Sequence, residues 1–472
     1  MDFSKDQKHF KMLAKDFIKK VKDKEISVIK NTEKILKEAK NINKEYSYFN
    51  FISEEYALKQ AQEIEKSIKQ NKAQGSLLGL PISVKDCICT QSIPSSSGSK
   101  ILENYIPPFN ATVIQKCLQE GAIIIGKTSQ DEFGFGGFST NSAFEIPKNP
   151  FDKTRATGGS SGGSAGFTQA TSLPHISIAE STGGSIVNPS SFCGVYGLCP
   201  TYGLISRYGL IDYANSLDKI GPMAKNIEDI ELMLNTIKGQ DPKDSTSLNQ
   251  ELKKSKIKKI AIIKESLGVD KQIKDLILEK LDSLKIKYNL ISLPITQRYG
   301  IQTYYLIAMS EASTNLAKLS GLTHGSQLHL KGTFNEYFSE VRSKFLGKEA
   351  KRRIILGTFA RMSGFRNAYY LKAMKVRTLI INEYKKAFKK YDLLVSPTMP
   401  ILPPKFSEIE KLTPLQNYMM DILTVGPNLA GLPHSNIPAG FINKLPVGIL
   451  FIADHLCENN LIEIGKKLKW QK

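Results

Sequence analysis

The chain has 472 residues and a formal net charge of +20 at pH 7, with 41% hydrophobic and 23% charged residues. This composition is ordinary for a globular protein that buries a core, and it argues against a disordered chain. No apolar run reaches the roughly 20 residues that a membrane-spanning helix needs, so we expect no membrane contact. The excess of Lys and Arg is compatible with a polyanion such as RNA as a partner, although the runs at 253–259 and 385–390 are also typical of solvated helix faces.

The cysteines and the N-terminus indicate where the protein works. The six cysteines contain no C-x-x-C pair and no histidine partner at the spacing of zinc ligands; they are Cys87, Cys89, Cys117, Cys193, Cys199 and Cys457. The first residues carry acids and lack the apolar segment of a secretory signal. The sequence therefore predicts no metal site and a reduced, cytoplasmic setting.

The N-terminal third begins with amphipathic helices and continues as strand, helix and strand. The predicted helices span 7–41, 54–72 and 112–120, and the predicted strands span 77–84 and 122–125. Lys85 follows directly after the first of these strands, so we expect it at a strand end.

The rest of the chain repeats the alternation of strands and helices. A strand at 176–179 leads into a glycine-rich stretch, and a polar surface connection is expected at 239–250. Beyond it, strands are predicted at 258–264, 286–293 and 393–397, and helices at 271–284, 304–320 and 367–390. This order predicts an α/β fold with a central sheet covered by helices.

Two Gly-Gly-Ser clusters, within 157–166 and 180–185, frame one short apolar run. Glycine lacks a Cβ, so such clusters let backbone N–H groups converge on a small target and bring a hydroxyl close to it. That arrangement suits acyl transfer. A flexible linker is the alternative, but a linker would not be followed at once by the apolar segment that begins at Ile186.

Two other motifs match known patterns and are rejected. Residues 121–128 satisfy the P-loop expression, but its inner positions are Ala-Ile-Ile-Ile, which form a strand rather than a cradle of exposed amides. Ser97-Gly98-Ser99-Lys100 matches the S-x-x-K element of penicillin-recognising enzymes, but no S-D-N element follows it.

A serine nucleophile needs a base, and no histidine is well placed by sequence to be one. We expect structural or surface roles for His9, His175, His324, His329, His434 and His455. A neutral lysine can serve instead. Lys85 is the candidate, because burial among uncharged hydroxyls would favour the neutral amine.

Lys85-Asp86, the 158–165 cluster and Thr182-Gly183-Gly184-Ser185 together resemble the amidase-signature family. The resemblance implies one α/β/α sandwich domain over 1–472 with a central mixed sheet; it divides into a helical segment 1–74, a signature region 75–240 and a remainder 241–472. It also implies a Ser-cisSer-Lys triad. The nucleophile would be Ser185, the bridging residue Ser160 in a cis peptide, and the base Lys85. The backbone amides of Thr182, Gly183, Gly184 and Ser185 would form the oxyanion hole.

Within that family, several stretches are similar to the glutaminase subunits of tRNA-dependent amidotransferases. They include 99–104, 110–113, 126–128, 131–133, 311–316 and 428–433. This similarity implies ammonia release from glutamine for conversion of Glu-tRNA(Gln), Asp-tRNA(Asn) or both. It implies a heterotrimer with subunits B and C, with tRNA bound mainly by the partner. No cofactor is expected in this chain, and ATP and Mg are expected at the partner subunit.

The same similarity suggests the residues that bind glutamine. Arg353 resembles the arginine that holds the α-carboxylate, with Arg352 as the alternative. Asp421 resembles the acid that pairs with the α-amino group, and Tyr304 resembles a tyrosine of the pocket. A zwitterionic substrate requires one cation and one anion at a fixed separation.

The chain departs from the family pattern beside the nucleophile. Relatives usually read Asp-Thr-Gly-Gly-Ser-Ile-Arg, whereas this chain has Ser181 and Val187 at the two ends of that stretch. Loss of both charges leaves no unpaired buried charge, and Glu180 is a candidate for supplying some of the lost polarity. Two other functions stay open: a stand-alone amidase acting on another amide, and a tRNA-binding scaffold whose site has decayed.

Overall fold

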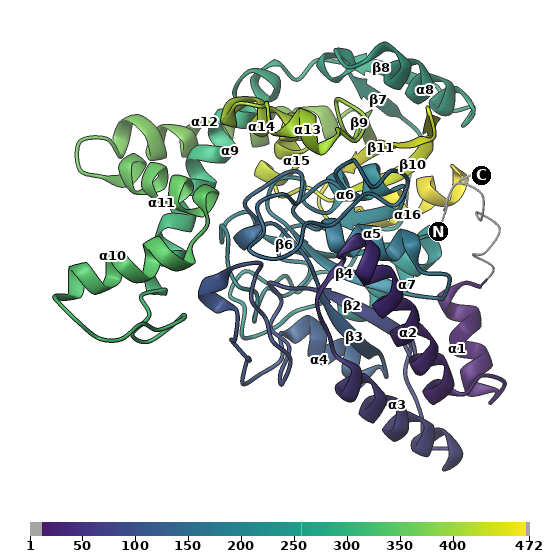
Figure 1. Cartoon of the computed structure of the whole chain (residues 1–472). Coiled ribbons are helices and arrows are strands. Elements are labelled where there is room, and N and C mark those ends of the chain that lie inside the picture. Colours follow the sequence, from purple (N-terminus) through teal and green to yellow (C-terminus); the bar gives the residue numbers. More distant parts are fainter. Residues whose placement is uncertain (1–11, 256, 469–472) are drawn as a thin grey trace.

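A computed structural model describes residues 12–255 and 257–468 and shows one mixed sheet with helices on both faces (Figure 1). The strands are β1 (Phe49–Ile52), β2 (Pro81–Lys85), β3 (Ile123–Thr128), β4 (Ile176–Ser181), β5 (Tyr196–Cys199), β6 (Lys219–Ala224), β7 (Ile260–Ile263), β8 (Tyr288–Ile291), β9 (Leu393–Pro397), β10 (His434–Ile442) and β11 (Leu445–Ala453). The predicted α/β fold with a central mixed sheet is confirmed.

The α-helices precede, connect and follow these strands. They are α1 (Ala14–Lys22), α2 (Val28–Tyr46), α3 (Glu54–Lys69), α4 (Thr112–Gln119), α5 (Gly162–Ala170), α6 (Val187–Cys193), α7 (Ile227–Ile237), α8 (Lys271–Asp282), α9 (Pro294–Asn315), α10 (Phe334–Phe345), α11 (Lys348–Arg361), α12 (Lys372–Phe388), α13 (Phe406–Ile409), α14 (Pro414–Tyr418), α15 (Val425–Leu429) and α16 (Glu458–Lys467). Short 3-10 turns lie at Lys100–Leu102, Glu132–Gly134, Lys264–Leu267, Leu316–Lys318 and Met419–Asp421, and a π-helical turn lies at Asn367–Leu371.

The strand order is β1-β3-β2-β4-β6-β5-β10-β11-β9-β7-β8. Strands β3, β2 and β4 run parallel, as do β9, β7 and β8, and the remaining pairs are antiparallel. β2 therefore lies between two parallel neighbours. Because the carboxyl ends of parallel strands meet at one edge, the ends of β2 and β4 are brought together there.

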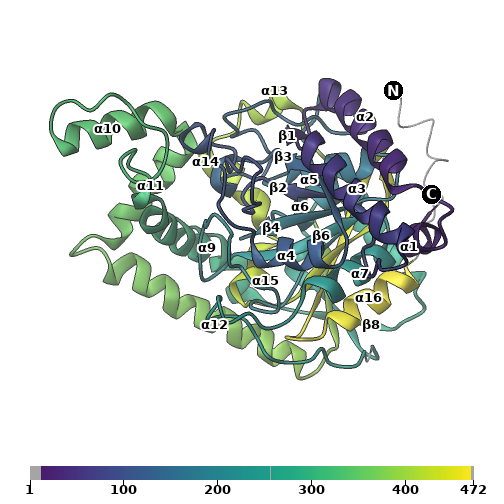
Figure 2. The same ribbon diagram turned by 90° about the horizontal axis from the view of Figure 1, so that it is seen from below.

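Successive side chains of β11 enter two separate apolar cores, as the two-residue period of a strand requires. In β11, Ile449 and Phe451 face the core that packs against the N-terminal helices, whereas Leu450 and Ile452 face the core formed with α9, α12 and α15. Figure 2 shows α1, α2 and α3 on the opposite side of the sheet from α9 and α12. The cavity described below opens on the α9 side.

The predicted elements agree with the structure in type but differ at their ends. The helix expected at 7–41 is two helices, α1 and α2, because the chain turns between them with Lys24 in the left-handed region (φ 62°). Residues 7–11 of that prediction lie outside the described residues. The strand expected at 77–84 begins only at Pro81, since Leu77 to Gly79 form a turn.

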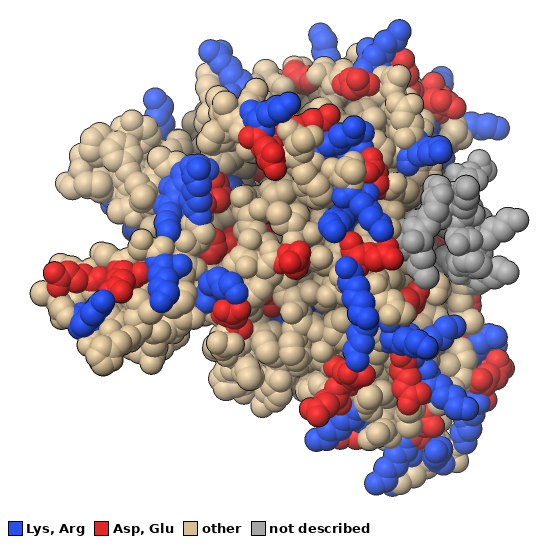
Figure 3. All heavy atoms as spheres, in the orientation of Figure 1, with Lys and Arg blue, Asp and Glu red and all other residues tan. Residues whose placement is uncertain are grey.

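The surface carries its positive charge in dispersed form. Figure 3 shows Lys and Arg spread over the visible face and interleaved with Asp and Glu. Ion pairs between exposed side chains, such as Lys40 with Glu54 and Lys153 with Glu45, contribute to this mixture. None of the helices in the described part of the chain is both long and apolar enough to cross a membrane.

Helices α9 and α11, which carry the residues of one pocket wall, approach each other at a glycine. A Cβ added to Gly357 of α11 would lie 1.8 Å from the Met309 carbonyl oxygen of α9. Backbone atoms cannot turn aside as a side chain can, so this contact sets the distance between the two helices. Gly300 of α9 differs, because a Cβ there would meet Val425 at 3.5 Å, an ordinary van der Waals distance.

We expect Gly357→Ala to destabilise the protein by roughly 1–3 kcal/mol, because the overlap with the α9 backbone forces the helices apart. Chemical denaturation of the purified chain measures this change. Gly300→Ala is the matched control, and it should be neutral or stabilising by up to about 1 kcal/mol, since alanine favours a helix over glycine. A Gly357→Ala variant at least as stable as the wild type would contradict the expectation.

Candidate active site

Lys85, the last residue of β2, is fully buried and lies at the centre of a polar cluster. Its Nζ donates to the Ser160 hydroxyl at 2.8 Å, to the Glu180 backbone carbonyl at 3.0 Å and to the Glu180 carboxylate at 2.8 Å. Glu180 belongs to β4, the parallel neighbour of β2. The register of the two strands therefore places the lysine beside the carbonyl and the carboxylate of Glu180.

The expectation that Lys85 is surrounded by uncharged hydroxyls is wrong. The Glu180 carboxylate forms a buried ion pair with it, with both side chains at most 4% exposed. A buried ammonium group without an opposite charge would be costly, and the carboxylate offsets that cost. The number of these acceptors matches the three protons that an ammonium group can donate.

Ser160 reaches Lys85 from the first glycine-rich cluster. The Gly159–Ser160 peptide bond is cis, as expected, and Gly158 has a φ of +76° that favours glycine. Helix α5 begins directly after Ser161, whose hydroxyl also donates to the Glu180 carbonyl at 3.1 Å. Ser161 thus binds the β4 residue that also holds Lys85, whereas Ser160 contacts Lys85 itself.

Ser185 lies in the turn between β4 and α6 and is 7% exposed. Within residues 12–255 and 257–468, its hydroxyl makes no hydrogen bond and the N–H groups of Gly183 and Gly184 have no protein acceptor. A Cβ on Gly183 would lie 2.6 Å from the Tyr304 ring, and one on Gly184 would lie 2.3 Å from the Thr424 hydroxyl. Glycine is therefore required for this turn to fit between those side chains.

The two departures from the family pattern are both fully buried. Ser181, at the end of β4, has a hydroxyl with no hydrogen-bond partner among the described residues. Its neighbour across the sheet is Lys219, which is 2% exposed and donates to the Leu432 carbonyl at 3.0 Å. Burial lowers the pKa of Lys219. Val187 adds only apolar surface, so this side of the turn carries no ion pair like that of Lys85.

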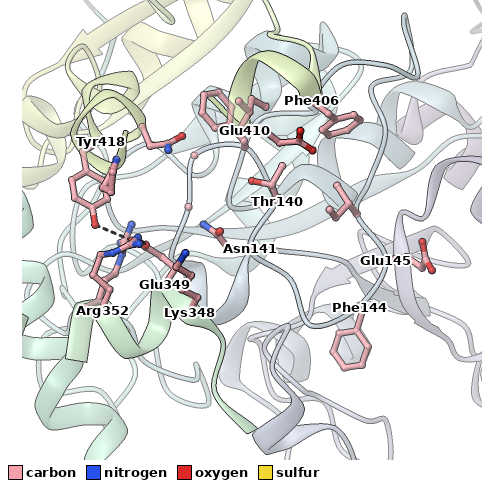
Figure 4. A pocket seen from close by; sticks show the side chains of 18 of the residues that line it. Thr140, Asn141, Phe144, Glu145, Lys348, Glu349, Arg352, Phe406, Glu410 and Tyr418 are labelled. Atoms are coloured by element: carbon pink, nitrogen blue, oxygen red, sulfur yellow. Dashed lines mark hydrogen bonds and ion pairs between the residues drawn. The ribbon is translucent and has the colours of Figure 1, made fainter. Parts of the chain in front are cut away.

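A cavity of about 750 Å³ opens between α11, the loop at 136–148 and the segment 406–418 (Figure 4). Lys348, Glu349 and Arg352 project into it from α11, opposite Tyr418. Arg353 and Tyr305 also line it. Its wall therefore combines charged groups with aromatic rings, a composition suited to a small polar ligand.

Arg353 is almost fully buried, whereas the Arg352 side chain is 33% exposed. The Arg353 guanidinium donates to Glu349 at 2.9 Å and to the Tyr213 hydroxyl at 2.6 Å. Its carbon atom lies 5.1–5.7 Å from the centres of four aromatic rings, which stabilise the cation. The rings belong to Phe135, Tyr213, Tyr305 and Tyr418.

Asp421 is buried and accepts a hydrogen bond from the Tyr305 hydroxyl at 2.7 Å. Burial raises the pKa of this carboxyl group to about 6, against the hydrogen bond and the Arg353 charge, which lower it. The Tyr304 ring makes an edge-to-face contact with the Tyr305 ring and lies against Gly183 of the nucleophile turn. The three predicted substrate residues are thus linked through Tyr305.

Sequence reasoning missed Glu349, Tyr213, Tyr305 and Tyr418 as neighbours of these residues. Glu349 accepts from Arg352, Arg353 and Tyr418, and so joins both candidate arginines. Its spacing of three and four residues before the arginines on one helix was a usable signal. The tyrosines gave none, because they come from separate parts of the chain.

The rejected motifs have structural roles. Ile123 to Ile125 are buried in β3, and Lys127 is fully buried with acceptors in the 88–95 loop. His175 bonds the Ser83 hydroxyl, and burial lowers its pKa to about 3. Among the described residues, no three His, Cys, Asp or Glu side chains gather as a metal site would require. All six cysteines are free.

Comparison with known proteins gives consistent matches over almost the whole chain. The family model described as Amidase matches residues 30–462. The A subunit of the glutamyl-tRNA(Gln) amidotransferase of Archaeoglobus fulgidus is 46% identical, covering 88% of this chain and 90% of that protein. The protein of the same name from Thermoanaerobacter pseudethanolicus is 43% identical, with 94% and 93% covered. The crystal structure of its counterpart from Thermotoga maritima has a TM-score of 0.75 and 33% identity, with 93% and 91% covered.

We expect Asp421→Asn to stabilise the protein at pH 7. The folded-state pKa of about 6 exceeds the ordinary value of 3.8, so the contribution of this group is favourable below pH 4 and is lost as the pH rises through 6. The difference of about two pH units corresponds to roughly 3 kcal/mol, which the variant should recover. Denaturant unfolding at pH 4 and pH 7 measures it.

Asp244→Asn is the control of opposite sign. Hydrogen bonds from Arg207 and Thr246 lower the pKa of Asp244 despite the opposing effect of its burial, so this variant should lose stability at pH 7. Equal stability of Asp421→Asn and the wild type at pH 7 would show that Asp421 is not held against its charged form.

Proposed function

The chain belongs to the amidase-signature family, and from this premise we propose that it is the glutaminase subunit of a tRNA-dependent amidotransferase. It hydrolyses glutamine and supplies ammonia for conversion of Glu-tRNA(Gln), and of Asp-tRNA(Asn) where the partner presents it. The partner subunits, B and C of a heterotrimer, bind the tRNA and hold the ATP and Mg that activate it. The relatives' names support this assignment.

The hydrogen bond between Lys85 and Ser160 carries the proposal for the chemistry. Packing of the apolar core does not require a buried lysine to contact a serine in a glycine-rich turn. The contact is what a lysine base needs in order to pass a proton to and from a serine nucleophile. We assign Ser185, whose hydroxyl makes no hydrogen bond to the described residues, as that nucleophile.

In the first half-reaction, Ser185 Oγ attacks the side-chain amide carbon of glutamine. Its proton passes to Ser160, whose own proton passes to the neutral amine of Lys85. The carbonyl oxygen becomes negative, and the free N–H groups of the turn at 182–185 stabilise it. Lys85 then returns the proton through Ser160 to the amide nitrogen, the C–N bond breaks, and ammonia leaves a γ-glutamyl ester on Ser185.

In the second half-reaction, water attacks the ester and gives its proton along the same route. The C–O bond to Ser185 breaks, and the Ser185 hydroxyl recovers its proton. The products are glutamate and the free enzyme, and one water is consumed for each ammonia released.

Arg353 binds the α-carboxylate and Asp421 the α-amino group of glutamine, with Tyr304 against the turn between them. Burial disfavours the Arg353 cation, but the surrounding rings and Glu349 outweigh that effect and hold the pKa of the guanidinium above its ordinary value. The free N–H groups of its guanidinium remain for the substrate, since two of its nitrogens contact Glu349 and Tyr213. Asp421 must be ionised for this task, so substrate binding weakens below pH 6.

We expect Ser185→Ala to lower ammonia release from glutamine by at least about a thousandfold, because the variant cannot form the acyl intermediate. The assay measures ammonia with the partner subunits, tRNA and ATP present. Undiminished release by this variant would contradict the proposal.

The same preparation separates the other two functions. A stand-alone amidase would act on simple amides without partners and would not respond to glutamine. A decayed scaffold would form no covalent adduct when Ser185 meets a glutamine-like electrophile, whereas the proposed enzyme forms one.

We expect Arg353→Lys to raise the KM for glutamine by about 10- to 100-fold, because lysine lacks the planar fork that binds a carboxylate through two hydrogen bonds. Arg352→Lys is the matched control, since it changes the adjacent residue in the same way and shares Glu349. It should alter KM by less than about threefold, the effect of a partly exposed pair. Steady-state kinetics of ammonia release measures both variants, and a larger effect at Arg352 would reverse the assignment.

A further inference from the structure

Glu180 connects the base to a second buried carboxyl group. One of its oxygens contacts Lys85 Nζ at 2.8 Å, and the other lies 2.8 Å from the Thr182 hydroxyl. That same hydroxyl lies 2.8 Å from an oxygen of Asp218. All four residues are at most 3% exposed. They form one continuous chain of hydrogen bonds that ends at Ser160.

A count of protons shows that this hydrogen-bonded network needs one more proton than Thr182 and Lys85 supply. The threonine hydroxyl has a single proton and can donate to only one of its two carboxyl neighbours. The other neighbour must itself donate to the threonine oxygen, and only a protonated carboxyl group can do so. Without that proton, two buried carboxylates would both face the single hydroxyl of Thr182. One of them would then receive no hydrogen bond from it.

The surroundings of Asp218 identify it as the protonated partner. Its second oxygen accepts two backbone N–H groups, from Tyr213 and Ala214, both at 2.9 Å. The proton therefore lies on the oxygen that faces Thr182. Burial, followed by the neighbouring Glu180 charge, raises the pKa of Asp218 well above its ordinary value. The hydrogen bonds then all point toward Glu180, from Asp218 through Thr182 on one side and from Lys85 on the other.

We propose that Glu180 and Asp218 share one proton, held on Asp218, and that the Glu180 carboxylate sets the pH at which Lys85 loses its proton and becomes the base. Glu180 is a positioning residue, because it acts on the substrate only through Lys85. This inference relies on the proposed function for the identity of the substrate. The assignment of the protons does not depend on that function. When Lys85 is activated, one of its N–H bonds breaks, the proton leaves to solvent, and the Ser160 hydroxyl donates to the freed lone pair.

Other titratable groups face this hydrogen-bonded network without contacting Lys85 Nζ. Asp212, which faces Asp218, forms an ion pair with Lys318 at 3.7 Å. Cys87 and Cys199 face Glu180, and burial raises the pKa of each thiol, so both stay uncharged. Asp131, near Lys85, is buried and accepts the N–H groups of Ser139 and Asn141. Lys219 on β6 turns its amine to the Leu432 carbonyl. Glu180 therefore remains the carboxylate in direct contact with Lys85.

The test is the pH profile of kcat/KM for ammonia release by the assembled complex. Glu180→Gln removes the charge and keeps an amide oxygen as an acceptor for Lys85. The acid limb of the profile is the fall of kcat/KM at low pH, where Lys85 holds its proton. In Glu180→Gln this limb should move to lower pH by about one to three units, the effect of removing an opposite charge at this distance. Below the wild-type limb the variant should therefore be about tenfold more active than the wild type for each pH unit by which the limb moves.

Asp218→Asn is the matched control. Its amide nitrogen donates to Thr182 as the protonated acid does, and its oxygen accepts the two backbone N–H groups, so the acid limb should stay in place. If Glu180 held the proton instead, this variant would force Glu180 to ionise and the limb would rise, which would overturn the assignment.

Thr182→Val provides a second variant with the opposite sign. It removes the hydroxyl that donates to Glu180, so the carboxylate holds the Lys85 proton more strongly and the limb should rise. A merely structural role for Glu180 and Thr182 would lower kcat in both variants without moving the limb, and that result would overturn the proposal. Thermal unfolding confirms that each variant is folded.

The pH dependence of Ser185 labelling by phenylmethanesulfonyl fluoride, followed by mass spectrometry, keeps this test independent of the substrate. The serine oxygen bonds to sulfur, fluoride leaves, and Lys85 takes the proton. A shift in labelling without ammonia release from glutamine would refute the proposed function alone. Unshifted labelling in Glu180→Gln would refute the role of Glu180, whatever the substrate is.

Discussion

The arrangement of this protein depends on one buried cation. Lys85 ends a strand in the interior of an eleven-stranded sheet, where water cannot solvate it, and all three of its protons must therefore find acceptors in the protein. Those acceptors come from β4 and from the turn before α5. The parallel register of β2 with β4 and the close approach of the glycine-rich turn are thus both required by the same amine group.

The glycines of the signature region follow from that closeness. Around the polar cluster, carboxylates and rings occupy the space that a Cβ would need. On Gly159 a Cβ would lie 2.3 Å from the Asp131 carboxylate, and on Gly183 it would touch Tyr304. The same glycines leave N–H groups of the nucleophile turn uncovered. Close packing and an exposed backbone are therefore two results of one sequence feature, which is why the glycine clusters mark the site in the amino-acid sequence itself.

Chemistry that resides in a local sequence could be predicted, whereas chemistry made by distant contacts could not. The strand end singled out Lys85 and the glycine clusters singled out their serines, while the roles of Ser160 and Ser185 came from the family resemblance; the structure brings Lys85 and Ser160 into contact. β10 and β11 were missed, although they form the centre of the sheet, because two adjacent antiparallel strands buried on both faces show no alternation of polar and apolar residues. The partner of Lys85 was also missed, because the register that brings Glu180 to it is set by the whole sheet.

The charged state of the site is therefore a property of the fold rather than of any motif. Burial raises the pKa of Asp131, Asp218 and Asp421 together, so the protonated form of each is favoured relative to an exposed aspartate. Two other carboxyl groups of this region have cationic partners, Glu180 beside Lys85 and Glu349 between two arginines. Each of these two ion pairs positions a basic side chain that the proposed chemistry uses: Lys85, which acts as the base once it has lost a proton, and Arg353, which binds the substrate carboxylate. Burying a charge is costly, so an ionisable side chain of this site can be charged only where the protein supplies partners for it. The polar residues around each such side chain set its pKa.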